Sequence, residues 1–342
     1  MKPYTAGERR QGAIKLSSNE NPRGCSPEAA AAIRESIAEV HIYPDGAARA
    51  LKTALADTHG VTQDQIVLGN GSDEVMTMIA ATYLNPGESV LVGEHTFSQY
   101  AFAARLFDGV VRHVPMPDLT FDPVRILPMI DRTVRLLFLC TPNNPTGLSI
   151  SRADLERLLR EVPRDVLVVV DHAYIDYQED PQACDALEYI AQYPNLVALR
   201  TFSKAHGLAA LRVGYGIAGS ERIREIERVR SPFNVSTLGQ NAAIASLEAS
   251  AFVRESSELN RAGKQRMMEL FRSLEIEFLP SQANFLTIRV TGEAQEFARE
   301  IASRGITVRP LNSFGLPDQI RITIGTPEQI DLLENALRRI LT

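Results

Sequence analysis

Residues 166–174 read Val-Leu-Val-Val-Val-Asp-His-Ala-Tyr, an apolar run that leads directly into an acid, an imidazole and a phenol. The run from Val166 to Val170 has the length of a strand and is far too short to cross a bilayer. A strand without polar alternation is typical of a sheet that is buried on both faces, which is the usual environment of parallel strands. The stretch therefore predicts a central strand whose carboxyl end carries polar side chains.

Short apolar segments and amphipathic helical patterns alternate on both sides of this stretch. Strands are predicted at residues 65–68, 89–92, 110–114, 135–139, 166–170, 196–200 and 213–218. Helices are predicted at residues 27–39, 72–84, 97–107, 151–161 and 220–229, with an Ala- and Leu-rich helix that ends near Gly60. This alternation predicts an α/β fold with a mainly parallel central sheet and helices on both faces.

The pattern changes after about residue 240. Two long helices are predicted at residues 237–249 and 252–274, followed by an apolar segment at 284–289, strands at 306–309 and 320–324, and helices at 293–303 and 327–341. These elements predict a smaller α+β domain. We therefore divide the chain into an N-terminal arm (1–25), a large domain (26–250) and a small C-terminal domain (251–342) that packs with the arm.

Composition limits the possible functions. Of the 342 residues, 44% are hydrophobic and 23% are charged, which is the balance of an ordinary globular protein. The net charge of −6 leaves no basic surplus to neutralise phosphates, so we expect neither a nucleic-acid nor a membrane partner, although a few arginines could still bind a small anion. The three cysteines form no CxxC pair and the N-terminus has no apolar signal segment, which predicts a cytoplasmic protein.

Polar residues gather where four of the predicted strands end. They are residues 69–74 (Gly-Asn-Gly-Ser-Asp-Glu), 141–147 (Thr-Pro-Asn-Asn-Pro-Thr-Gly), 171–174 (Asp-His-Ala-Tyr) and 200–204 (Arg-Thr-Phe-Ser-Lys), with Arg212 eight residues further on. Ligands of open α/β sheets bind beyond the carboxyl ends of the strands. Together these segments offer an amine for a Schiff base, an acid for a pyridinium nitrogen, a phenol and a phosphate cup, which are the groups that pyridoxal phosphate requires.

Each segment alone has an ordinary structural explanation. A Gly-Ser turn before a helix is usually only a turn, a lysine after a strand is usually solvated, and an acid after a valine run is often a helix cap. Their combination is what favours a cofactor site. Residues 214–219 match the dinucleotide fingerprint GxGxxG, but they lie inside a predicted strand, so a nicotinamide site is not expected. The six histidines show no metal-ligand spacing, and no metal is expected.

At these segments the chain resembles the histidinol-phosphate aminotransferase family, a branch of the fold-type-I pyridoxal-phosphate aminotransferases. The resemblance rests on Asn-Asn-Pro-Thr-Gly (143–147) together with Thr-Phe-Ser-Lys (201–204) and the arginine that follows at 212. It extends nearly end to end, from Lys-Leu-Ser-Ser-Asn-Glu-Asn-Pro (15–22) to Arg-Ile-Thr-Ile-Gly-Thr (321–326). It implies an aspartate-aminotransferase-like fold with bound pyridoxal phosphate.

The resemblance also implies catalytic roles. Lys204 would form the Schiff base with the cofactor and shuttle the substrate proton. Asp171 would pair with the pyridine nitrogen and keep it protonated, because a nearby carboxylate favours the cationic form. Tyr174 and Asn144 would donate hydrogen bonds to the oxygen on the ring.

Further cofactor-binding residues are implied by the same resemblance. Those expected to hold the phosphate are Gly71, Ser72, Thr201, Ser203 and Arg212, and Asp73 is expected as a further cofactor-binding residue. Phe97 stands where the family stacks an aromatic ring on the cofactor, with a core position at a helix start as its alternative. Tyr43 matches a Tyr-Pro motif that reaches the phosphate of the partner subunit's cofactor, which implies a homodimer with shared active sites.

Three arginines are the predicted substrate ligands. Arg321 is expected to grip the substrate α-carboxylate with its planar guanidinium, assisted by Asn144; a surface ion pair is its alternative. Arg309 occupies the place of the family arginine for a distal anion, either phosphate or γ-carboxylate, and its alternative is an ion pair at a strand end. Arg23 departs from the family pattern, and it either adds a second positive charge to that distal pocket or faces solvent.

The leading hypothesis for the function is transamination of L-histidinol phosphate with 2-oxoglutarate, giving imidazole-acetol phosphate and glutamate in histidine biosynthesis. An aromatic amino acid aminotransferase on the same scaffold is the first alternative. The second is a pyridoxal-phosphate-dependent decarboxylase of a phosphothreonine type, in which the bond from Cα to the carboxylate is broken. A non-enzymatic binding module is a distant fourth, because it would not explain Lys204, Asp171 and Tyr174.

Overall fold

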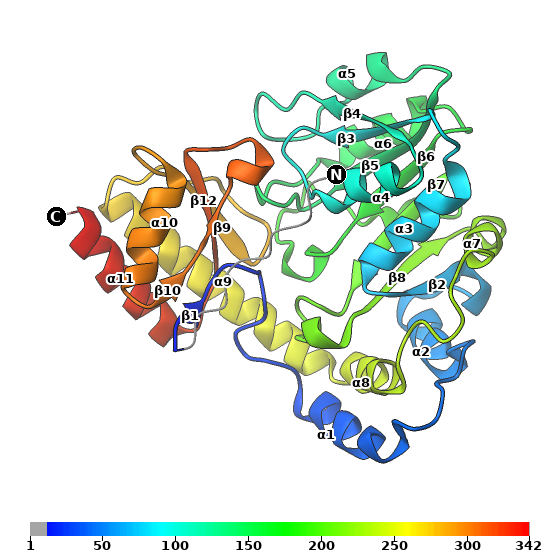
Figure 1. The fold of residues 1–342 in the computed structure, drawn as a ribbon, viewed down its shortest axis with the longest axis horizontal. Coiled ribbons are helices and arrows are strands. Elements are labelled where there is room, and N and C mark those ends of the chain that lie inside the picture. The colour runs from blue at the N-terminus through cyan, green and yellow to red at the C-terminus, as the bar shows by residue number, and fades with distance from the viewer. Residues whose placement is uncertain (1–11, 342) are drawn as a thin grey trace.

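A seven-stranded sheet forms the centre of the larger part of the molecule (Figure 1), as seen in a computed structural model that describes residues 12–341. The strand order is β2-β8-β7-β6-β5-β3-β4. The strands are β2 (Ile66–Asn70), β3 (Ser89–Gly93), β4 (Val110–Val114), β5 (Val134–Cys140), β6 (Leu167–Asp171), β7 (Leu196–Thr201) and β8 (Val213–Ala218). Among them β8 alone runs opposite in direction to the other six, so the prediction of a mainly parallel sheet is confirmed.

The central strands are apolar because both faces of the sheet are covered. In β2, Val67 belongs to a core cluster that includes α3, whereas Ile66 and Leu68 belong to another cluster that includes Leu51 of α2. Since alternate residues of a strand point to opposite faces, helices cover both sides of the sheet, as predicted. The helices of this part are α1 (Pro27–Ser36), α2 (Arg49–His59), α3 (Ser72–Tyr83), α4 (Gln99–Leu106), α5 (Pro123–Ile126), α6 (Arg152–Glu161), α7 (Ser220–Glu227) and α8 (Thr237–Glu248).

The register of the sheet brings the polar strand ends to one edge. Cys140 at the end of β5 pairs with Asp171 at the end of β6, and Asp171 pairs with Leu199 on β7. These strands are parallel, so the segments that follow them leave the sheet on the same side. The residues predicted to meet there are therefore neighbours in space.

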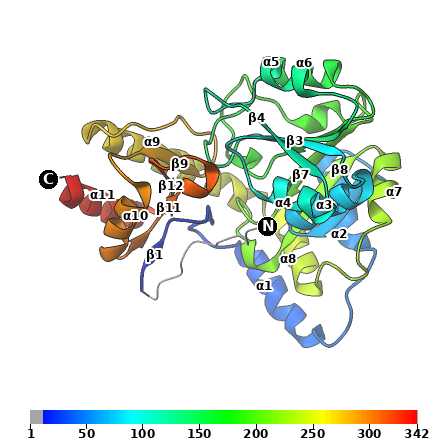
Figure 2. The ribbon, with the colours of Figure 1, turned by 45° about the horizontal axis from the view of Figure 1, so that its top comes forward.

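A second, smaller part contains the C-terminal elements (Figures 1 and 2). Its sheet is antiparallel, in the order β11-β12-β9. The elements are α9 (Ser250–Ser273), β9 (Phe285–Arg289), α10 (Ala294–Ser303), β10 (Ile306–Thr307), β11 (Arg309–Pro310), β12 (Gln319–Thr323) and α11 (Pro327–Leu341). These elements have a hydrophobic core of their own, to which Leu16 from the N-terminal segment contributes.

The N-terminal segment includes a strand that was not predicted. Ile14 and Lys15 form β1, which pairs in parallel with β10. The predicted strand at 306–309 is in fact two short strands, because the chain leaves β10 at Thr307 and joins a different sheet at Arg309. Within residues 12–341, no helix has the length and apolar character that a membrane span requires.

The boundary near residue 250 stays a prediction. Helix α9 begins there and touches both parts of the molecule. Near its start the Ser257 hydroxyl donates a hydrogen bond of 2.7 Å to the carbonyl oxygen of Asp176, in the larger part. Near its end Phe271 belongs to the C-terminal core.

Candidate active site

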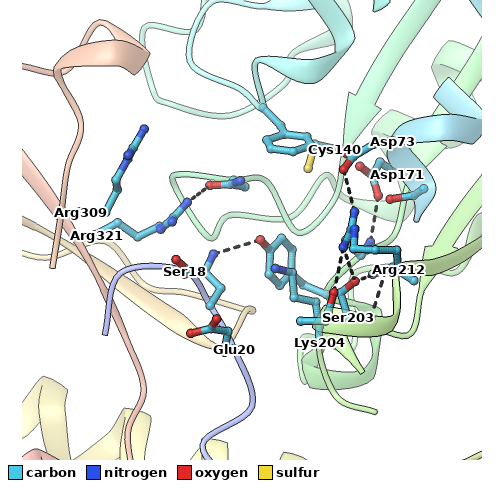
Figure 3. A pocket seen from close by; sticks show the side chains of 18 of the residues that line it. Ser18, Glu20, Asp73, Cys140, Asp171, Ser203, Lys204, Arg212, Arg309 and Arg321 are labelled. Carbon is cyan, nitrogen blue, oxygen red and sulfur yellow. Dashed lines mark hydrogen bonds and ion pairs between the residues drawn. The ribbon is translucent and has the colours of Figure 1, made fainter. Parts of the chain in front are cut away.

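A cavity of about 240 Å³ lies between the two parts of the molecule, at the carboxyl edge of the large sheet. Figure 3 shows Arg309 and Arg321 entering from one side and Asp171, Ser203 and Arg212 from the other. The side chains around it come from the N-terminal segment, the ends of β5, β6 and β7, the start of α3, and β11 and β12. The predicted residues that line it are Ser72, Asp73, Phe97, Asn144, Asp171, Tyr174, Thr201, Ser203, Lys204, Arg212, Arg309 and Arg321.

Asp171 is a buried acid at the end of β6. Its Oδ2 accepts a hydrogen bond of 2.7 Å from the Tyr100 hydroxyl, and its Oδ1 accepts one of 3.0 Å from the Ala173 backbone N–H. Burial raises the pKa of Asp171 to about 6, although both hydrogen bonds lower it. A carboxylate in such surroundings is stabilised by a cationic partner, so the acid is suited to pair with a protonated ring nitrogen.

Lys204 projects into the cavity from the loop after β7. Enclosure by the protein lowers the pKa of Lys204 to about 8, and the neighbouring positive charge of Arg321 acts in the same direction. Its Nζ lies 5.5 Å from the centroid of the Tyr174 ring. A lysine with a lowered pKa carries a substantial fraction of neutral, nucleophilic amine near neutral pH.

Tyr174 and Asn144 present polar groups to the same cavity. Tyr174 is buried, packs edge-on against Phe285 at 5.3 Å between ring centroids, and accepts a hydrogen bond of 3.0 Å from Asn19 Nδ2. Burial raises the pKa of Tyr174 well above that of a free phenol, so the hydroxyl stays protonated and can donate. The Oδ1 atom of Asn144 accepts a hydrogen bond from Arg321 Nη1.

The start of α3 and the loop after β7 form a cradle for an anion. Gly71, just before the helix, has φ = 80°, and a Cβ there would lie 2.5 Å from Arg212 Nη2. The Thr201 and Ser203 hydroxyls are 3.0 Å apart and Ser72 is the first residue of α3. Free N–H groups at a helix start, hydroxyls and a guanidinium are the usual ligands of a phosphate.

Two of the predicted cofactor-binding residues act on this cradle indirectly. Gly71 does not line the cavity itself; its missing side chain leaves the room that the Arg212 guanidinium occupies. Asp73 Oδ2 lies 3.0 Å from Arg212 Nη2, and a carboxylate would repel a phosphate. Its contact with the arginine indicates that it orients the guanidinium.

Arg309 and Arg321 are direct cross-strand partners on β11 and β12. Partner residues in an antiparallel pair point to the same face, so both side chains flank one cavity. Arg321 is buried, and its Nη2 donates a hydrogen bond of 2.9 Å to the Ser17 carbonyl oxygen. Two guanidiniums on adjacent strands repel each other, and an anion bound between them would remove that cost.

The structure does not bring Arg23 or Tyr43 to this cavity. Arg23 Nη2 forms an ion pair of 2.8 Å with Glu255 Oε2, and its guanidinium carbon lies 4.7 Å from the Phe252 ring centroid. The phenol of Tyr43 is 80% exposed and stacks on Phe233 at 4.8 Å, so a role in the chain's own cavity has no support.

Several lining residues were not predicted. Ser18, Asn19 and Glu20 of the N-terminal segment line the cavity, as do Ala173 and Phe314. Asn19 lies within the quoted Asn-Glu-Asn-Pro motif, but no sequence pattern indicates that its side chain reaches Tyr174. Within residues 12–341, no three His, Cys, Asp or Glu side chains come together as a metal ion would require.

Comparison with known proteins agrees with this geometry. The sequence model of the family described as aminotransferase class I and II matches residues 11–340. The chain belongs to that family. This aminotransferase is 42% identical to a histidinol-phosphate aminotransferase of Moorella thermoacetica over all of this chain and 91% of that protein. It is also 42% identical to one of Brevibacillus brevis, over 96% and 90% of the two chains.

A solved structure is similar over nearly the same length. The histidinol-phosphate aminotransferase of Sinorhizobium meliloti, in complex with pyridoxal-5′-phosphate, superimposes on this aminotransferase with a TM-score of 0.89 and 27% sequence identity. The alignment covers 97% of this chain and 91% of that one. The predicted aspartate-aminotransferase-like fold of type I is thereby confirmed, together with the predicted family.

Proposed function

We propose that this aminotransferase uses pyridoxal phosphate to transfer the amino group of L-histidinol phosphate to 2-oxoglutarate, giving imidazole-acetol phosphate and glutamate in histidine biosynthesis. The relatives at 42% identity carry that activity in their names. The observation that carries the proposal is the pair Arg309 and Arg321, which flank one cavity opposite a separate anion cradle. One anion site suits the cofactor phosphate, and the other suits an anionic substrate.

The residues present fit pyridoxal phosphate. Because Gly71 lacks a Cβ, the Arg212 guanidinium can reach the cradle at the start of α3, where the phosphate would be held. The buried Asp171 would face the ring nitrogen, and Tyr174 would face the ring oxygen together with Asn144. Phe97, which lines the same cavity, would stack on the ring. When bound, the cofactor supplies an aldehyde for an amine and a ring that accepts electrons.

The protein's own groups hold and move protons. Lys204 is suited to take the proton from the substrate Cα and to return it to the cofactor side, because its lowered pKa lets it act as a base near neutral pH. The carboxylate of Asp171 would hold a proton on the ring nitrogen by charge attraction. These roles require both residues to face one cavity, as they do.

The two arginines suit both substrates. Glutamate has two carboxylates, and one can be bound by Arg321 with Asn144 while the other is bound by Arg309. The only anion of histidinol phosphate is its phosphate, and the pair of guanidiniums can share it. The imidazole would then lie near the aromatic side chains of Phe97 and Phe314 in the cavity wall.

A substrate comparison tests this assignment. We predict that Arg309→Ala lowers kcat/KM for histidinol phosphate roughly 10- to 100-fold, because a charge-assisted hydrogen bond is lost. The same change should alter kcat/KM for phenylalanine by less than about 3-fold, since that substrate has no distal anion. Arg289→Ala is the matched control, because Arg289 lies on β9 of the same sheet and is paired with Asp318 at 3.2 Å.

Other outcomes of this comparison would favour the alternatives. Equal losses for both substrates would contradict the role of Arg309 in binding a distal anion. A wild-type preference for phenylalanine would indicate an aromatic amino acid aminotransferase. Release of carbon dioxide from phosphothreonine would indicate a decarboxylase, which breaks the bond between Cα and the carboxylate carbon.

We also propose a cytoplasmic homodimer in which Tyr43 reaches the cofactor phosphate of the partner subunit. The support is a surface groove lined by residues 40–44 and 236–238, in which Val40, Ile42 and Tyr43 are exposed. Ile42→Asp should yield monomers in analytical ultracentrifugation and should lower the activity in an enzyme assay. Leu332, which lies on α11, is also exposed, and Leu332→Asp should change neither property. A fully active wild-type monomer would contradict the proposed dimer. The support for a cytoplasmic location is that all three cysteines are free thiols.

A further inference from the structure

Asn19 contacts the Tyr174 hydroxyl from a part of the chain far from the strand ends that carry the other predicted cofactor ligands. Its Nδ2 lies 3.0 Å from the Tyr174 oxygen, and the two residues are separated by 155 positions in the sequence. Both side chains are buried, with 1% and 3% of their surface exposed. In the proposed function Tyr174 donates to the ring oxygen, and this second contact on its hydroxyl is available to influence that bond.

The Asn19 side chain is held in one orientation. Its backbone N–H donates to Thr323 Oγ1 at 2.9 Å, and the Thr323 hydroxyl donates to Asn19 Oδ1 at 3.3 Å. The Asn284 amide donates to the Asn19 carbonyl oxygen at 3.0 Å. With Oδ1 bound to Thr323, the amide nitrogen is the group that faces Tyr174. The backbone of Asn19 has φ = 55°, a conformation that asparagine adopts more readily than most residues.

The direction of this hydrogen bond decides where the Tyr174 hydrogen goes. A hydroxyl has one hydrogen, and its oxygen can accept as well as donate. Because the amide of Asn19 donates to that oxygen, the hydroxyl hydrogen is left for an acceptor elsewhere. The remaining polar space next to the hydroxyl is the cavity that Tyr174 itself lines.

We infer that Asn19 is a positioning residue that turns the Tyr174 hydroxyl hydrogen into the cavity, toward the ring oxygen of the cofactor. This inference rests on the proposed function. The same part of the chain also binds the substrate arginine, because the Ser17 carbonyl oxygen accepts a hydrogen bond of 2.9 Å from Arg321 Nη2. Residues 17–19 therefore connect the predicted carboxylate ligand with the predicted ligand of the ring oxygen.

The hydrogen bond from Tyr174 should affect the absorbance of the bound cofactor in a definite direction. A hydrogen bond donated to the ring oxygen stabilises its negative charge, so the nitrogen that Lys204 contributes to the chromophore loses its proton at a lower pH. Anything that turns the Tyr174 hydrogen away should raise the pH midpoint of the visible absorbance band. A general loss of stability has no reason to move this midpoint in that direction.

The test is a pH titration of the absorbance of the protein loaded with pyridoxal phosphate. Asn19→Gly removes the donor and tolerates the left-handed backbone, and it should raise the midpoint by roughly half a pH unit. Asn19→Asp keeps the shape but places an acceptor against the hydroxyl, so the rise should be about one pH unit or more. Thr323→Val, which removes the group that fixes the amide, should give a smaller shift of the same sign.

Two controls separate a directed hydrogen bond from a loosened N-terminal segment. Asn21→Ala removes another buried amide of that segment, one that donates to Ala205 O and Ser256 Oγ and should leave the midpoint unchanged. Tyr174→Phe should raise the midpoint by itself, and adding Asn19→Gly to it should produce no further shift.

Each outcome bears on one statement. A wild-type protein without a visible band would overturn the proposed function. A wild-type band whose midpoint is unmoved in Asn19→Gly and Asn19→Asp would overturn the role of Asn19 alone. An equal shift in Asn21→Ala, or an undiminished shift of Asn19→Gly in the Tyr174→Phe background, would also overturn it.

Discussion

Lys204 and Asp171 show how one enclosed site shifts the pKa of an amine and the pKa of an acid in opposite directions. Burial disfavours charge, so it lowers the pKa of Lys204 to about 8 and raises the pKa of Asp171 to about 6. Both shifts favour the neutral form of the group in the protein without its cofactor. A cofactor that bonds covalently to the amine and offers a cationic nitrogen to the acid would remove both penalties.

The lowered pKa of Lys204 predicts how the rate of covalent cofactor binding depends on pH. In the folded protein the pKa lies below the ordinary lysine value of 10.5, so the neutral amine accumulates as pH rises through about 8. The same sign means that this lysine destabilises the cofactor-free protein at low pH, and that the cost disappears as pH rises from about 8 toward 10.5. The rate at which the visible band forms after mixing with pyridoxal phosphate should therefore be half-maximal near pH 8.

Stopped-flow absorbance measures this rate. Lys204→Ala is the control, and it should form no lysine-linked chromophore and retain no transaminase activity, because both the amine and the proton shuttle are lost. A half-maximal rate near pH 10.5 in the wild type would show that the pKa of Lys204 is not lowered. Near-normal transamination by Lys204→Ala would refute its assigned role.

At the scale of single residues, the sequence points to a cavity-lining residue where that residue lies in a local motif. Asp171, Lys204 and Arg321 were selected from their neighbours in the chain, and all three line the cavity. Arg23 is expected either in the distal pocket or facing solvent, and the structure places it at the surface, where it pairs with Glu255, more than two hundred residues away. Asn19 was missed because its contact with Tyr174 exists only in the folded chain.

At the scale of elements, the buried strands were predictable because a short apolar run without polar alternation is typical of a strand that is buried on both faces. β6 was predicted at 166–170 and spans Leu167–Asp171. Two-residue strands such as β1 and β10 carry no such signal, because periodicity cannot be defined over two residues. The antiparallel direction of β8 was also beyond local reasoning, since direction depends on which strand it pairs with.

Gly214 in the fingerprint-like segment 214–219 has a structural role that the local sequence motif does not reveal. Gly214 lies inside β8, and a Cβ there would come within 2.2 Å of the Ser72 backbone nitrogen. Its role is to let the start of α3 approach the sheet closely. The motif thus helps to form an anion cradle, although by a different geometry from that of a dinucleotide fold.

At the scale of the whole molecule, the site depends on how the two parts and the N-terminal segment meet. The predicted cofactor ligands lie at the carboxyl edge of the large sheet, the predicted substrate arginines lie on β11 and β12, and residues 18–20 line the cavity with them. Sequence patterns could indicate each group separately. Their meeting in one cavity of about 240 Å³ follows from the packing of the two parts.

The most direct test of the account is the absorbance spectrum of the protein loaded with pyridoxal phosphate, followed as amino donors are added. We predict a visible band that disappears as the pyridoxamine form accumulates, both with histidinol phosphate and with glutamate. Adding 2-oxoglutarate after histidinol phosphate should restore the band. The account would be contradicted if no visible band formed with added pyridoxal phosphate, or if the band formed and neither donor removed it.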